Sequence, residues 1–84
     1  MNDMNNASIF TRMVLENIHG LRRSKEYSQD FMAYKLNISQ NAYSKIESGK
    51  TPLTLERFFK IAELLDVSPA RLLEVELLRI PHLG

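Results

Sequence analysis

The sequence contains no cysteine, and this absence excludes several kinds of site at once. Disulfide bridges, thiolate metal sites and a cysteine nucleophile all require that residue. Because small secreted domains usually rely on disulfides, we expect this 84-residue chain in a reducing compartment, the cytoplasm. Its first ten residues also have neither the basic start nor the apolar stretch of a signal peptide.

Long apolar runs and catalytic motifs are missing as well. No apolar run approaches the roughly 20 residues that span a membrane, so no membrane is expected as a partner. There is no glycine-rich phosphate loop, and no nucleophile has an identifiable base. His19 and His82 are far apart in sequence and form no metal-binding pattern, so we expect His19 at a helix surface. The sequence therefore predicts no enzyme, no catalytic or metal-binding residue and no cofactor.

The composition that remains is that of one folded domain covering residues 1–84. Apolar residues make up 44% and charged residues 25%, as in globular proteins. The net charge is only +1, but its distribution is uneven. Residues 22–50 contain six Lys or Arg and three Asp or Glu, a balance of +3, whereas the rest contains five basic and seven acidic residues. Positive charge is thus concentrated in the middle of the chain.

Apolar spacing and capping residues predict an all-α fold of five helices with no strands. The expected ranges are about 7–24, 28–36, 39–49, 54–65 and 68–79, with a flexible N-terminus at 1–7. The expected N-caps are Ser28, Ser39, Thr54 and Ser68, the last followed by a proline at the first helical position. Only about three residues, 37–39, join the second and third helices, which suits a helix-turn-helix motif at 28–47.

Apolar stripes identify the expected core. In the first helix the stripe consists of Phe10, Val14, Ile18 and Leu21, and Ile9 and Met13 widen it. In the second and third helices the expected core residues are Met32, Ala33, Leu36, either Ala42 or Tyr43, and Ile46. In the fourth helix they are Leu55, Phe58, Phe59, Ala62 and Leu65. The fifth helix has apolar residues on more than one face, beginning with Leu72, Leu73 and Val75. A lone domain cannot bury all of them. We therefore expect a dimer surface at Leu77, Leu78, Ile80 and Leu83, together with Ile9 and Phe10.

The stretch from Leu21 to Leu73 resembles the phage repressor/Cro-type, or XRE, family of bacterial helix-turn-helix proteins. The matching segments are "LR" at 21–22, "YSQDFMAYKLNIS", "QNAYSKIESGK" and "TLERFFKIAELLDVSPARLL", in this order and spacing. The resemblance implies a lambda-repressor-like DNA-binding domain with its core at 18–73 and a C-terminal extension at 74–84. Asn37 stands where the family usually has a glycine, and Asn also tolerates a left-handed backbone.

The start of the third helix carries the expected base contacts. Recognition helices of this class contact bases from their N-terminal residues, and amide side chains can bond an adenine edge in the major groove. The expected set is Ser39, Gln40, Asn41, Ser44 and Lys45, among which there is no acidic residue. Lys45 can reach either a guanine edge or a phosphate.

The resemblance also assigns contacts to the DNA backbone and one structural pair. Gln29 is implied to bond a phosphate from the start of the second helix, where free backbone N–H groups also point. The full expected phosphate set is Gln29, Ser28, Ser48, Lys50 and Tyr34, with plain solvent exposure as the alternative for Tyr34. Arg22 and Glu47 resemble the buried ion pair of phage repressors, so we interpret both as structural.

The sequence therefore predicts a transcription regulator that acts as a repressor. It is expected to bind a palindromic operator in double-stranded DNA as a homodimer. A phage-type repressor, an antitoxin and a controller of a restriction–modification system all fit this plan. The alternative is a protein-interaction module of antitoxin type, whose main partner is a toxin or another protein. The acid-free start of the third helix favours DNA.

Overall fold

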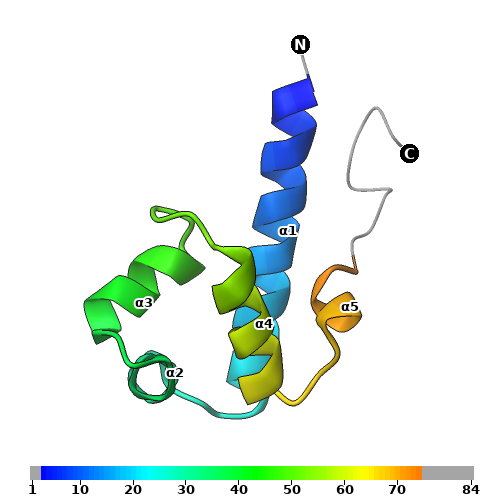
Figure 1. Cartoon of the computed structure of the whole chain (residues 1–84). Helices are drawn as coiled ribbons and strands as arrows, with labels where there is room; N and C mark the ends of the chain where they lie inside the picture. The colour runs from blue at the N-terminus through cyan, green and yellow to red at the C-terminus, as the bar shows by residue number, and fades with distance from the viewer. Residues whose placement is uncertain (1–2, 75–84) are drawn as a thin grey trace.

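The computed structural model describes residues 3–74, with side chains from residue 7 onward, and this part of the chain forms five helices and no strand. The helices are α1 (Asp3–Ser24), α2 (Gln29–Leu36), α3 (Gln40–Glu47), α4 (Leu55–Leu64) and α5 (Pro69–Leu72) (Figure 1). The predicted all-α fold with a helix-turn-helix is confirmed.

Four helices begin at the hydroxyl residues expected to cap them. The side-chain oxygens of Ser28, Ser39 and Thr54 accept hydrogen bonds from the backbone N–H three residues later, at 2.9, 3.0 and 3.1 Å. Ser68 caps α5 in the same way at 3.4 Å, with Pro69 as the first helical residue. Each cap satisfies a backbone donor that the helix itself leaves free, and is worth about 1 kcal/mol.

Left-handed residues end the helices and turn the chain. Asn37 closes α2 at φ 61° and ψ 44°, and its backbone N–H donates to the carbonyl of Tyr34. Glu26 and Asp66 have the same sign of φ after α1 and α4, and Gly49 follows α3 at φ +84°. The Asn at position 37 thus provides the backbone conformation for which glycine is the usual choice.

Two helix ends differ from the prediction. Helix α1 begins at Asp3, not at Ala7 or Ser8, because neither proline nor glycine interrupts the chain before Gly20. Helix α5 ends at Leu72, and Leu73 and Glu74 are not helical, so the predicted continuous helix to Arg79 is wrong. Asn17 explains this end, because its Nδ2 lies 3.0 Å from the carbonyl oxygen of Leu72 and 2.6 Å from that of Glu74.

The core lies where α1, α2, α4 and α5 meet, with α3 closing one side. Its buried members from these helices are Leu15, Ile18, Met32, Ala33, Leu36, Tyr43, Phe58, Ile61, Ala62, Leu65 and Leu72. Ala33 is 1% exposed, as expected for a small residue between closely packed helices. In Figure 1, α3 and α5 lie on opposite sides of α1, and α1 contacts both.

Several predicted core positions are at the surface instead. Leu55 is 73% exposed because it is the first residue of α4, one turn before the buried Phe58. Phe59 is 52% exposed because one residue turns a helix by about 100° away from Phe58. In α1, Phe10 is only half-buried, whereas the unpredicted Leu15 is buried. The apolar residues expected to form a dimer surface, Leu77, Leu78, Ile80 and Leu83, lie outside the described residues.

Candidate nucleic-acid interface

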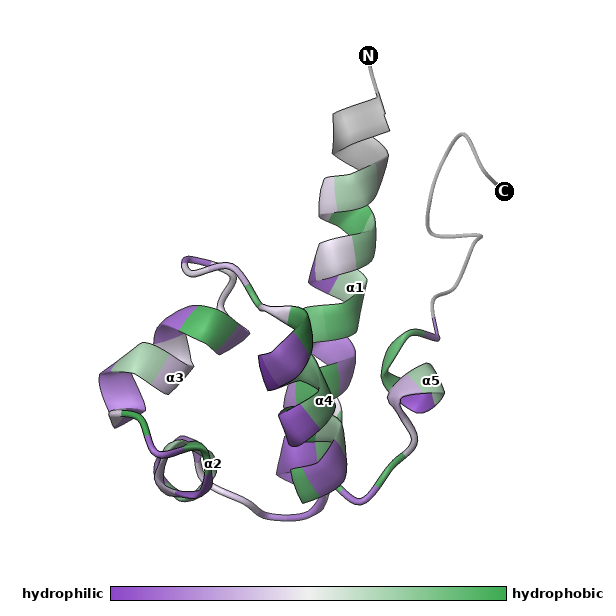
Figure 2. Ribbon diagram, in the orientation of Figure 1, coloured by the Kyte–Doolittle hydropathy of each residue, from purple (hydrophilic) through white to green (hydrophobic). Residues whose placement is uncertain are grey.

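Helix α3 has two faces of different character. Tyr43, Ile46 and Glu47 are buried, which fixes one face against the rest of the domain. Gln40, Asn41 and Lys45 are exposed and Ser44 is half-buried, so these four lie on the other face in two rows spaced four residues apart. The first turn contains no acidic residue, and the N-terminal end of α3 is purple, hydrophilic, in Figure 2. The structure therefore brings together four of the five predicted base contacts on one exposed polar surface.

Ser39, the fifth predicted base contact, stands at the start of the same surface. Its Oγ accepts a hydrogen bond from the backbone N–H of Ala42 at 3.0 Å. Because a hydroxyl has one proton and two lone pairs, the Ser39 O–H is still able to donate while it caps the helix.

The residues predicted to contact phosphate lie in several local environments. Ser28 caps α2, and Ser48 donates to the carbonyl of Lys45 at 3.3 Å. Lys50 is exposed in the loop after α3, and Tyr34 is 78% exposed on α2. Gln29, at the first position of α2, donates from Nε2 to Glu47 at 3.2 Å. Its side-chain oxygen, Oε1, has no partner among residues 7–74.

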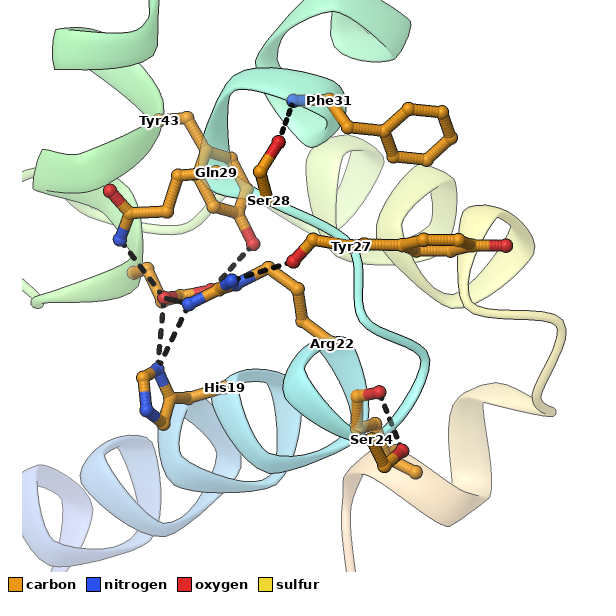
Figure 3. Close-up of polar contacts among 10 residues, drawn as sticks. His19, Arg22, Ser24, Tyr27, Ser28, Gln29, Phe31 and Tyr43 are labelled. Atoms are coloured by element: carbon orange, nitrogen blue, oxygen red, sulfur yellow. Dashed lines mark hydrogen bonds and ion pairs between the residues drawn. The ribbon is translucent and has the colours of Figure 1, made fainter.

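Glu47 is the centre of a polar network that joins three helices. Arg22 of α1 forms two hydrogen bonds to its carboxylate, Nε to Oε2 and Nη2 to Oε1, both at 2.9 Å. The hydroxyl of Tyr43 donates to Oε2 at 2.7 Å, and His19 Nδ1 lies 3.1 Å from Oε1. With Gln29 from α2, these side chains converge on one carboxylate (Figure 3). Both Arg22 and Glu47 are buried, at 6% and 8% exposed, so the two residues expected to pair structurally do meet in the interior.

The network determines the ionisation of its members. Burial by itself would raise the pKa of Glu47, but the hydrogen bonds of Arg22, His19, Tyr43 and Gln29 outweigh it and lower the pKa from 4.5 to about 2. The hydrogen bond to Glu47 raises the pKa of Arg22. Burial raises the pKa of Tyr43, and its bond to Glu47 acts in the same direction. At neutral pH the carboxylate is charged and its charge is neutralised inside the domain.

The sequence does not predict the bonds of three members of this network to Glu47. It indicates Tyr43 only as an apolar core residue, His19 only as a surface residue and Gln29 only as a phosphate contact. For Tyr43 and His19 the helical spacing indicates which residues they can reach. Tyr43 stands four residues before Glu47 on α3, and His19 stands three residues before Arg22 on α1. His19 has a half-exposed side chain, so it belongs both to the surface and to the network.

The described part of the chain holds neither a group of three or more metal-ligating side chains nor a helix long and apolar enough to cross a membrane. Residues 18–72 match a family model described as helix-turn-helix. No curated protein and no solved structure matches the chain. The matched range covers more than half of the chain and includes α2, α3 and the Glu47 network from Arg22 to Glu47. The chain therefore belongs to the helix-turn-helix family of the XRE (Cro/C1) type, and it is a transcription regulator that binds double-stranded DNA.

Proposed function

We propose that the protein is a repressor that binds a palindromic operator as a homodimer, with α3 of each copy in the major groove. The observation that supports this most directly is the division of α3 into a buried face, held by Glu47, and an exposed, acid-free polar face. The proposed base contacts are Ser39, Gln40, Asn41, Ser44 and Lys45. Amide and ammonium groups are suited to adenine and guanine edges, respectively.

The proposed backbone contacts are Gln29, Ser28, Ser48, Lys50 and Tyr34. The side-chain oxygen of Gln29, Oε1, is an acceptor and cannot donate to a phosphate. We therefore propose that Nε2 donates one of its hydrogens to Glu47 and the other to a phosphate. This arrangement would connect a phosphate on the DNA to the carboxylate that holds α3. The N-terminus of α2 adds its own free N–H groups.

A homodimer is proposed because one α3 covers only half of a useful site. Two-fold proteins of this class bind half-sites about 34 Å apart, one helical turn of DNA. The C-terminal sequence contains four apolar residues, Leu77, Leu78, Ile80 and Leu83, in addition to those that a single domain can bury. A second copy of the chain could cover them. Ile9 and Phe10 on α1 are half-buried and are proposed to complete this surface. The cysteine-free composition fits action in the cytoplasm.

Selection of bound duplexes from a random pool tests the function, and variants test the contacts. We expect an inverted repeat, and promoter reporters carrying it should show lower transcription when the protein is present. Gln40→Ala and Lys45→Ala should each weaken binding by about 1–3 kcal/mol and relax the preference at particular base pairs. Equal weakening on all sequences would make those residues phosphate contacts instead.

The alternative is a module that binds mainly a toxin or another protein, and the same selection distinguishes it. Specific DNA binding should weaken steeply with salt, because counterions compete for the phosphates. Failure to enrich or retain any duplex at low salt would contradict the proposed function and favour the alternative.

A further inference from the structure

A cleft of about 740 Å³ lies between α1, from Ala7 to His19, and the C-terminal half of α3. Thr11, Arg12 and His19 line it on α1. Ser44 and Ser48 line the opposite side, and Gln29 closes the end at α2. Three of these six residues are therefore proposed DNA contacts, and the other three belong to α1. Gln29, Ser44 and Ser48 therefore belong both to the cleft and to the proposed DNA-binding surface.

Most of this part of α1 lies outside the helix-turn-helix family match, which begins at residue 18. Helix α1 has 22 residues, and Figure 1 shows its N-terminal half extending past the other four helices. At 1.5 Å per residue, the 15 residues from 3 to 17 add about 22 Å of helix. The family match therefore covers His19 on the α1 side of the cleft but neither Thr11 nor Arg12.

Arg12 is the cation of this helix extension. It is exposed, and it has no hydrogen-bond or ion-pair partner among residues 7–74. Thr11 beside it is also exposed and carries a hydroxyl donor. Two carboxylates, Glu16 and Glu47, line the cleft as well, but the charge of Glu47 is already neutralised by its network and Glu16 makes an interaction of its own. A phosphate that approaches from the α3 side would thus meet an unpaired guanidinium.

We propose that Arg12 binds a backbone phosphate of the operator and that the DNA interface extends from α2 and α3 onto α1. This rests on the proposed position of α3 in the major groove, because Gln29 and Ser44, two of the proposed DNA contacts, line the same cleft as Arg12. Guanidinium and phosphate form strong, geometrically matched hydrogen bonds. The contact reads no base, so it adds affinity equally on every sequence.

The test is the salt dependence of binding to the selected operator duplex, measured by fluorescence anisotropy for wild type, Arg12→Gln and Arg12→Lys. Loss of one phosphate contact should lower the slope of log K against log salt by about 0.9. Arg12→Gln should therefore bind several-fold more weakly at low salt, with an unchanged base preference. Arg12→Lys should keep the slope of the wild type, because it keeps the charge.

Arg71→Gln is the matched control, since Arg71 lies on α5, across α1 from α3, and pairs with Glu74. Its slope should equal that of the wild type. An unchanged slope and affinity for Arg12→Gln would overturn the proposal, and so would a loss confined to one base pair or equal losses for Arg12→Gln and Arg12→Lys. If Arg12→Gln has no effect while Gln40→Ala still relaxes specificity, only the α1 contact fails. If the wild type binds no duplex, the proposed function fails with it.

Discussion

At the scale of single residues, Glu47 connects three helices of the site. Its carboxylate holds α1 through Arg22, α2 through Gln29 and the preceding turn of α3 through Tyr43. Removing one partner from a buried ion pair costs about 3–5 kcal/mol, because the other charge is left unpaired. The one acidic residue of α3 therefore carries its negative charge inside the domain.

The lowered pKa of Glu47 predicts a loss of stability in acid. The folded-state pKa of about 2 lies below the ordinary value of 4.5, so the stabilisation is fully present above about pH 4.5 and is lost as the pH falls towards 2. The difference between these two pKa values corresponds to about 3 kcal/mol of unfolding free energy. Urea unfolding of wild type and Glu47→Gln between these pH values should show a loss that is smaller in the variant by about this amount.

Glu63→Gln is the control for this titration, because Glu63 is an exposed residue of α4. It should leave the pH dependence of unfolding close to that of the wild type. The same acid-induced loss in Glu47→Gln and wild type would show that the network does not stabilise the charged carboxylate.

At the scale of helices, two glycines have opposite roles. Gly20 lies within α1, and a Cβ added there would have nothing within 4 Å. Gly49 follows α3 at φ +84°, and a Cβ there would lie 3.3 Å from Leu15 Cδ1 on α1. One glycine therefore weakens a helix without any steric need, and the other permits both a left-handed turn and close packing of α3 on α1.

The same substitution at the two positions should change stability with opposite signs. Gly20→Ala should raise the unfolding free energy by about 0.5–1 kcal/mol, because alanine is the better helix former. Gly49→Ala should lower it by about 1–2 kcal/mol through the left-handed backbone, and by more where Leu15 has to move. Urea unfolding of both variants measures the difference, and changes of equal sign would refute this explanation of the turn.

Helix ends that depend on nearby residues could be predicted from the sequence, and those that depend on distant residues could not. The caps of α2, α3, α4 and α5 were predictable because each depends on a hydroxyl and the backbone three residues later. The end of α5 was not, because it depends on Asn17, which is 55 residues away from Leu72 in the chain. The Arg22–Glu47 pair is also distant in sequence, and only the family resemblance predicts it. Tyr43 has helical spacing to Glu47, but that spacing does not show that its hydroxyl donates to the carboxylate.

At the scale of the whole molecule, DNA binding should depend on the association of two copies. Leu77→Asp combined with Leu78→Asp places two charges in the proposed dimer surface. We expect sedimentation at high micromolar concentration to change from the mass of two chains to that of one, and binding to the two half-sites to become independent. Leu73→Asp, at an exposed position before that surface, is the control and should remain dimeric. A monomeric wild type by light scattering would remove the dimer from the proposal.

The division of α3 into two faces has a consequence for how such a regulator diverges. The side chains that hold the helix, Tyr43, Ile46 and Glu47, are a different set from Gln40, Asn41 and Lys45, which face outward. Surface substitutions usually change stability by less than about 0.5 kcal/mol, so the outward set can be exchanged with little effect on folding. With the outward set as the proposed base contacts, new target preferences are accessible through a few mutations on an unchanged framework, and a duplicated copy of this gene could acquire a different DNA target without first losing its structure.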